Sequence, residues 1–177
     1  MEKIKWGIIG PGNIANNFAD GLKGSYSGQL VSIASKSEDR RKNFGDKYDI
    51  HPDFRFDSYE DIINSEHIDA IYISTPHTLH AQWTIKAAGK GKHILCEKPG
   101  AINFNEGKKI IDAVREAGVF YMEGFMYRCH PQIPKLVEII KNKIIGDVIS
   151  IETSFGFDMG KTIPDHRLFN KNLAGGG

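Results

Sequence analysis

Apolar runs of strand length alternate with longer segments of helical period along most of this chain. Continuous apolar runs predict strands buried on both faces, and apolar residues spaced by three or four positions predict helices. The expected strands are 4–9, 30–35, 54–56, 70–74, 93–96 and 119–122. The expected helices are 13–23, 38–48, one that starts at 58, 79–88 and 104–117. This alternation is typical of an α/β fold with a doubly wound parallel sheet.

Glycines and one polar motif mark the ends of the expected helices. Gly24, Gly89 and Gly118 follow the last periodic residue of three helices, where glycine commonly ends a helix. Ser58 and Asp61 resemble a capping box, with Asp in place of the usual Glu or Gln. The side chains expected to be buried are Ile14, Phe18 and Leu22 in the first helix, Phe44 in the second, and Ile110, Ile111 and Val114 in the last.

The pattern changes after Met122. Pro131 and Pro134 open another helix, because proline is tolerated in a first helical turn. The residues expected on its buried face are Leu136, Val137 and Ile140. Alternation over 147–157 then predicts a long strand of an antiparallel sheet.

These segments indicate two domains. We expect a dinucleotide-binding domain over 1–123 and the start of a second domain over 124–177. One strand cannot make a sheet, so the partners of 147–157 are expected beyond the given sequence. We therefore interpret the chain as cut off part-way through its second domain, and expect it to show no turnover by itself.

The composition narrows the class of protein. Of the 177 residues, 40% are hydrophobic and 25% charged, as in an ordinary globular protein. A net charge of +1 gives no general attraction to nucleic acid or to an anionic membrane, so any phosphate site must be local. The chain has neither signal-peptide features nor a long apolar span, which favours a cytoplasmic protein. Cys96 and Cys129 form no CxxC pair, and we expect both to be buried, reduced thiols.

A glycine-rich loop follows the first strand and opens the first helix. Gly10 would make the tight turn, Gly12 would let the backbone approach a pyrophosphate, and Ala15 would let the helix pack closely on the strand. The N–H groups at the start of a helix bind phosphate oxygens. This GxGxxA loop between a strand and a helix predicts a Rossmann-type dinucleotide site, with Gly10, Gly12, Asn13 and Ile14 in contact with the cofactor.

The end of the second strand favours NADP over NAD. An acidic residue there would bind the ribose hydroxyls of NAD, but this sequence has Ser35 and Lys36, with Arg40 just behind. Hydroxyls and cations suit the 2′-phosphate of NADP. Glu38 and Asp39 dilute the positive field, and ordinary surface charges at a helix start are the other interpretation.

Three further segments complete a family pattern. They are YISTPHTLH over 72–80, GKHILCEKP over 91–99 and MEGFMYRCHP over 122–131. With the glycine loop, and in this order, they resemble the glucose–fructose oxidoreductase, inositol dehydrogenase and rhizopine catabolism family (Gfo/Idh/MocA). The segment 122–131 resembles the branch that includes the dimeric dihydrodiol dehydrogenases, and the resemblance covers the whole chain.

The resemblance implies a Rossmann domain and a C-terminal α/β domain whose open antiparallel sheet forms the wall of the substrate cleft. That sheet is often an oligomer interface in the family, which implies a homo-oligomer. Lys98 matches the catalytic lysine and is also expected to contact cofactor and substrate, and Arg128 matches an arginine near both. Lys36 and Arg40 match positions used for the 2′-phosphate. Other positions expected at the cofactor are Ser74, Thr75, Pro76, His77, His80 and Glu97.

The expected reaction moves a hydride between nicotinamide and a secondary alcohol or aldehyde carbon of a sugar, cyclitol or dihydrodiol. Lys98 could donate a hydrogen bond to the substrate oxygen and exchange its proton. A second catalytic residue is expected beyond Gly177, and His166 is a candidate substrate contact. His77 and His80 have no third ligand at usable spacing, so we expect no metal. The alternative is a non-catalytic dinucleotide-binding sensor on the same fold.

Overall fold

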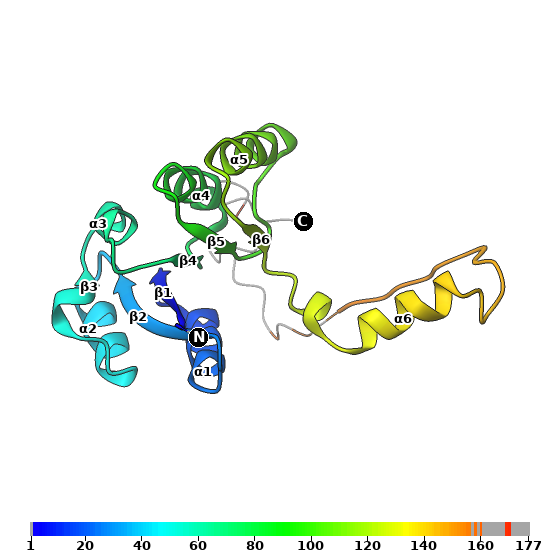
Figure 1. The fold of residues 1–177 in the computed structure, drawn as a ribbon, viewed down its shortest axis with the longest axis horizontal. Helices are drawn as coiled ribbons and strands as arrows, with labels where there is room; N and C mark the ends of the chain where they lie inside the picture. Colours follow the sequence, from blue (N-terminus) through cyan, green and yellow to red (C-terminus); the bar gives the residue numbers. More distant parts are fainter. Residues whose placement is uncertain (1, 157, 159, 161–168, 171–177) are drawn as a thin grey trace.

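The alternating pattern produces a six-stranded sheet with helices on both faces (Figure 1). The structure is a computed structural model and describes residues 2–156, 158, 160, 169 and 170. The strands are β1 (Ile4–Ile9), β2 (Gly28–Ala34), β3 (Arg55–Phe56), β4 (Ala70–Ile73), β5 (His93–Cys96) and β6 (Tyr121–Glu123). The α-helices are α1 (Asn13–Lys23), α2 (Glu38–Lys47), α3 (Tyr59–Asn64), α4 (His80–Ala88), α5 (Phe104–Ala117) and α6 (Gln132–Lys141). Three short 3-10 helices are η1 (Pro52–Phe54), η2 (His77–Leu79) and η3 (Met126–Cys129).

The order of the strands in the sheet is β3-β2-β1-β4-β5-β6, and every neighbouring pair is parallel. The chain builds one half outward from β1 to β3 and then returns to the centre to place β4 beside β1. Ligands of open α/β sheets bind where the order reverses in this way, at the carboxyl ends of the strands. The prediction of a doubly wound parallel sheet is confirmed.

Two hydrophobic cores lie on opposite faces of the sheet, because successive side chains of a strand point to opposite sides. Ile8 packs with Ala15 and Ala19 of α1, whereas its neighbour Ile9 belongs to the cluster that includes residues of α3, α4 and α5. Figure 1 shows α4 and α5 on one side of the sheet and α1 on the other. All of β4 and the last three residues of β1 are thus buried on both faces, as predicted for continuous apolar runs.

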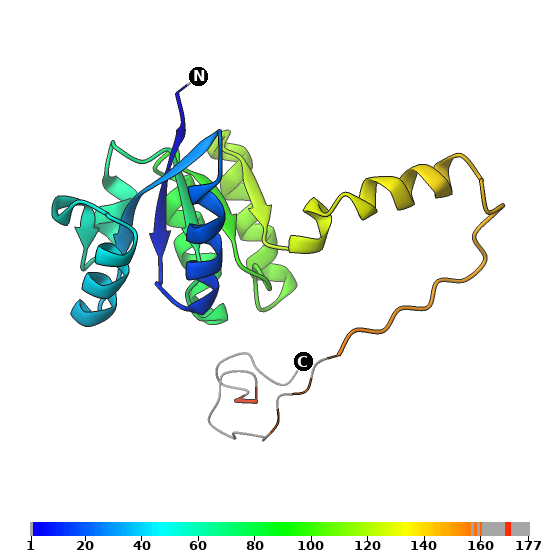
Figure 2. The same cartoon turned by 90° about the horizontal axis from the view of Figure 1, so that it is seen from below.

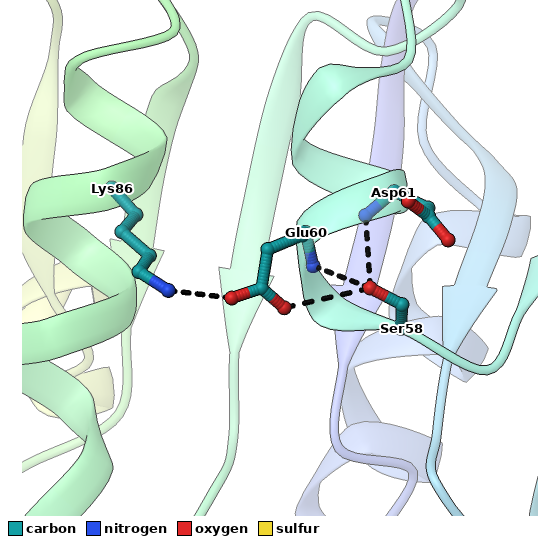
Figure 3. A network of polar contacts seen from close by, with 4 residues as sticks. All are labelled: Ser58, Glu60, Asp61 and Lys86. Carbon is teal, nitrogen blue, oxygen red and sulfur yellow. Dashed lines mark hydrogen bonds and ion pairs between the residues drawn. The ribbon is translucent and has the colours of Figure 1, made fainter.

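The start of α3 shows how side chains fix a helix end (Figure 3). Ser58 Oγ accepts hydrogen bonds from the N–H groups of Glu60 at 3.1 Å and Asp61 at 3.3 Å. The Glu60 carboxylate lies 3.4 Å from the same hydroxyl and pairs with Lys86 of α4 at 2.5 Å. Ser58 therefore caps the helix as predicted, but Glu60 rather than Asp61 adds the second interaction.

Two isoleucines expected in the core are exposed. Ile14 is 41% exposed, because α1 contacts the sheet through the small Ala15 and Ala19, which let the helix approach closely. Ile111 is 38% exposed, because it lies beside the stripe of α5 to which the buried Ile110 belongs. The side chains that meet the sheet are set by the angle at which each helix lies on it, which the helical period alone does not give.

The segment after β6 leaves the sheet. Figures 1 and 2 show α6 projecting away from the strands and their helices. The expected burial of its apolar stripe is wrong, since Leu136 is 47%, Val137 43% and Ile140 37% exposed. No described segment of the chain lies against that stripe as the sheet does against α5.

The strand predicted over 147–157 is also absent over 147–156, and Phe157 lies outside the described residues. A strand needs a neighbour to accept and donate its backbone hydrogen bonds, and no described segment pairs with this one. The boundary between domains at 123 and 124 stays a prediction.

The two cysteine thiols differ in their exposure to solvent. Cys96 ends β5 and is buried, but Cys129 ends η3 and is exposed, so the expected burial is wrong for Cys129. In the described part of the chain, none of the helices has the length and apolar character needed to cross a membrane.

Candidate cofactor-binding and catalytic site

Four loops meet at the carboxyl edge of the sheet. They follow β1, β2, β4 and β5 and begin at Gly10, Ser35, Ser74 and Glu97. Because all the strands are parallel, these loops lie along one edge, on either side of the point where the strand order reverses. Most of the residues expected at the cofactor are therefore gathered there.

The loop after β1 packs directly against the loop after β4. Gly10 has a φ of +91°, and a Cβ built there would lie 3.1 Å from the carbonyl oxygen of Ser74. The Ser74 hydroxyl donates a hydrogen bond of 2.7 Å to the carbonyl oxygen of Gly10. Both the backbone conformation and the close approach therefore require glycine, which is the tight-turn role expected for Gly10.

The next glycine faces open space. A Cβ at Gly12 would meet no atom within 4 Å in the described part of the chain. Among the described residues, α1 has neither a side-chain cap nor an acidic residue in its first turn, whereas α2, α3 and α5 are capped by Ser37, Ser58 and Asn103. The first N–H groups of α1, including those of Asn13 and Ile14, are thus suited to an anion. This cradle fits the pyrophosphate of a dinucleotide.

The loop after β2 carries the cations expected at a 2′-phosphate. Arg41 Nη1 donates to the carbonyl oxygen of Ser35 at 2.7 Å, so this arginine holds the loop. Lys36 and Arg40 are exposed, and the ammonium of Lys36 lies 5.9 Å from the centre of the Tyr59 ring. Burial raises the pKa of Tyr59, and nearby Arg40 opposes that rise. Lys36 and Arg40 therefore both lie near Tyr59, beside the end of β2.

The loop after β4 contains a buried hydroxyl that fits a ligand. Thr75 is 7% exposed, and its Oγ1 has no hydrogen-bond partner among the described residues. Pro76 is exposed, and His77 begins η2 directly after it. A buried hydroxyl beside the glycine loop is the kind of group that a bound cofactor satisfies.

His80 joins the loop after β4 to the loop after β5. Its ring is fully buried, with Nδ1 2.7 Å from the carbonyl oxygen of Pro99 and Nε2 2.8 Å from that of Thr75. Both ring nitrogens are thus used within the chain. His80 contributes to this edge of the sheet by tying two of its loops together.

The loop after β5 has a backbone held by hydrogen bonds and an exposed lysine. The Tyr72 hydroxyl donates to the Glu97 carboxylate at 2.6 Å, and burial, with this bond, raises the pKa of Tyr72 well above its ordinary value. The N–H of Glu97 donates to the carbonyl oxygen of Ile73 at 2.9 Å. Lys98 is exposed, and the Lys98–Pro99 peptide bond is cis. The arrangement presents the Lys98 side chain at the carboxyl edge, directly after β5.

A comparison with known protein families matches residues 4–125 to the "Oxidoreductase family, NAD-binding Rossmann fold". This match covers the whole sheet and the four loops described above. The chain belongs to this family.

Relatives within the family include two curated dehydrogenases. Mouse trans-1,2-dihydrobenzene-1,2-diol dehydrogenase is 34% identical over 176 residues, which are 98% of this chain and 51% of that protein. D-xylose 1-dehydrogenase (NADP(+)) 2 of Haloferax volcanii is 33% identical over 173 residues, 98% of this chain and 52% of that protein. The chain thus spans about half the length of these relatives.

A solved structure of the family agrees with the fold. It is a 3-ketoreductase from Actinomadura kijaniata in complex with TDP-benzene and NADP, in an open conformation. It is similar with a TM-score of 0.73 and 31% identity, over 82% of this chain and 45% of that one. The recognition of the family from the sequence is confirmed.

The structure does not bring the expected site residue Arg128 to this edge. Arg128 is exposed on η3, in the segment that leaves the sheet after β6. His166 lies outside the described residues. Within the described residues, no group of three or more His, Cys, Asp or Glu side chains is arranged to hold a metal ion.

Two polar residues at the site have no role in the sequence-based prediction. Tyr72 holds the carboxylate of Glu97, and Glu123 accepts a hydrogen bond from the N–H of Gly100 at 2.7 Å. Each is a polar residue within a strand close to the carboxyl edge of the sheet. That position could have marked them as candidates, because the same edge carries the loops of the site.

Proposed function

We propose that this chain is the cofactor-binding part of an NADP-dependent oxidoreductase that moves a hydride between nicotinamide and a secondary alcohol or aldehyde carbon. The presentation of Lys98 at the carboxyl edge is the observation that carries the proposal. Relatives named as dehydrogenases of a dihydrodiol and of D-xylose, and a 3-ketoreductase bound to NADP, support it. A sugar, cyclitol or dihydrodiol is the substrate class we propose.

We assign each part of the cofactor to a different group of the residues described above. Gly12 and the first turn of α1 would hold the pyrophosphate, and Lys36 with Arg40 would bind the 2′-phosphate. Thr75 and its neighbours Pro76 and His77 would line the nicotinamide end. A charge-assisted contact to the phosphate is worth about 1.5–3 kcal/mol, which corresponds to NADPH binding about tenfold to a hundredfold more tightly than NADH.

Bound NADP would supply the hydride acceptor, and Lys98 would act on the substrate oxygen. Its ammonium would donate a hydrogen bond to that oxygen and so stabilise negative charge as the hydroxyl proton leaves. Lys98 would take up that proton as it passes one of its own to a second group outside the described residues, so it ends the step as an ammonium. The loop anchors on both sides of Lys98 favour this role, because a proton-transfer group must be held within hydrogen-bond reach.

The proposal is tested in the full-length protein with Lys98→Met, which removes the amine and keeps an unbranched side chain of similar length. We expect kcat to fall about 10²- to 10⁴-fold, the usual contribution of such a group, while the dissociation constant of NADPH stays within a few-fold. Lys90→Met is the matched control, since Lys90 is an exposed lysine just before β5, at the opposite edge of the sheet.

Other outcomes have defined meanings. Loss of NADPH binding with turnover retained at saturation would make Lys98 a cofactor clamp. A variant with neither property changed would show that Lys98 takes no part in the reaction, and a full-length protein that binds NADPH without any turnover would favour the non-catalytic sensor. NADH titrated in parallel by fluorescence tests the cofactor, and equal affinities would contradict the assignment of Lys36 and Arg40.

A further inference from the structure

Glu123 reaches from the edge strand to the loop that carries Lys98. In the register of β5 and β6 it pairs with Cys96, the last residue of β5. The N–H of the following Gly124 donates to the carbonyl oxygen of Cys96 at 2.7 Å, which fixes the backbone of β6 at this point. From there the Glu123 carboxylate accepts the N–H of Gly100 at 2.7 Å.

The surroundings of Gly100 make this contact specific. Gly100 is buried, and a Cβ built there would collide with the hydroxyl of Tyr121. Tyr121 lies two residues before Glu123 on β6, so both side chains extend from the same face of the strand. A buried N–H that loses its acceptor is unfavourable, because water cannot readily replace the lost partner. Glu123 is therefore the group that keeps the Gly100 amide in place.

Lys98 lies between the anchors of its loop. The N–H of Glu97 is bound by Ile73 on one side, while Pro99 and Gly100 are held by His80 and Glu123 on the other. We infer that Glu123 is a positioning residue, whose carboxylate sets the direction of the Lys98 side chain by holding the Gly100 amide. This inference rests on the proposed function of Lys98.

The test compares three variants of Glu123 in the full-length protein. Glu123→Ala removes the acceptor and should lower kcat on the order of 10²-fold, because small misplacements of a reacting group cost rates of this size. The KM of the substrate and the dissociation constant of NADPH should stay within a few-fold. Glu123→Gln keeps an oxygen acceptor at the same reach and should restore kcat to within a few-fold of the original. Glu123→Asp keeps the charge, shortens the reach and should give an intermediate kcat.

A matched control lies in the first turn of α5, which follows the same loop. Glu106 also accepts a loop amide, that of Ile102 at 3.3 Å, but further along the chain and at the surface. Glu106→Ala should leave kcat unchanged. The melting temperature of every variant is measured, and if Glu123→Ala does not fold, the comparison of Glu123→Asp with Glu123→Gln decides.

A double variant separates this inference from the function on which it rests. If Glu123 acts through Lys98, adding Glu123→Ala to Lys98→Met should cause no further loss of kcat. A further loss would overturn the inference, as would a Glu123→Ala protein that is less stable but turns over normally. Equal losses in Glu123→Ala and Glu123→Gln would also overturn it. If Lys98→Met itself retains turnover, the proposed function fails, whereas an inactive Lys98→Met with an active Glu123→Ala rejects the positioning role alone.

Discussion

Helices α5 and α6 have the same kind of apolar stripe and opposite surroundings. In α5, Ile110 is 2% and Val114 9% exposed, because the stripe lies on the sheet. In α6, Leu136 is 47% and Ile140 37% exposed, because no part of the sheet lies opposite. The comparison shows that an amphipathic pattern determines a helix, whereas the burial of its stripe depends on a second element.

Strands depend on a second element even more than helices do. β1 pairs with β2 on one side and β4 on the other, while the alternating residues 147–156 pair with no described segment. A helix makes its backbone hydrogen bonds within itself, so α6 forms even where it projects from the sheet. A strand makes its backbone hydrogen bonds with neighbouring strands. The alternating residues 147–156 therefore form no strand where no described segment pairs with them.

The largest contrast between the two regions should be in thiol chemistry. Burial raises the pKa of Cys96 to about 12, whereas Cys129 is exposed. Since the thiolate is the reactive form, we expect Cys96 to react on the order of 10³-fold more slowly than an ordinary thiol at pH 8. In the native 177-residue chain, a thiol reagent should label Cys129 at once and Cys96 only after denaturation. Rapid labelling of both in the native chain would contradict the burial of β5.

The second contrast concerns stability. Ile110→Ala in α5 should lower the free energy of unfolding by about 2–5 kcal/mol, because it opens a cavity in the core. Ile140→Ala in α6 should change it by less than about 0.5 kcal/mol, as for a surface substitution. Urea unfolding of the two variants provides the measurement. Similar losses would mean that α6 packs in solution against a surface that the structure does not show.

The smallest contrast concerns ion pairs. Glu60 and Lys86 join α3 to α4, whereas Lys135 and Glu138 lie within α6. We expect a double-mutant cycle to give a coupling of about 0.2–1 kcal/mol for the first pair, and none in the unfolding of the sheet for the second.

The hydrogen bond with Lys86 lowers the pKa of Glu60 below its ordinary value of 4.5. The contribution of Glu60 should be complete above that pH and lost as the pH falls through the lowered pKa, which is measurable by unfolding at pH 3 to 6. If the coupling between Glu60 and Lys86 is unchanged at pH 3, it does not come from the ionised carboxylate of Glu60.

The part of the molecule that local pattern determines was predictable. The strand Ile4–Ile9, the turn at Gly10 and the cap at Ser58 each depend on neighbouring residues, and the structure confirms them. The contacts of Tyr72 and Glu123 join residues 25 and 23 positions apart in sequence. These contacts exist because the sheet places the ends of its strands side by side. A pattern of neighbouring residues in the sequence does not predict which strands are adjacent.

The order of the strands also has a consequence for how the chain folds as it is synthesised. β1 is made before the other strands of this sheet, yet one of its two neighbours, β4, is complete only when Ile73 has been added. Until then, one edge of β1 lacks its partner and the seam between Gly10 and Ser74 cannot form. Parallel pairs of this kind close long loops, which slows folding relative to local pairing. A nascent chain therefore leaves one edge of β1 unpaired throughout the synthesis of α1, α2 and α3.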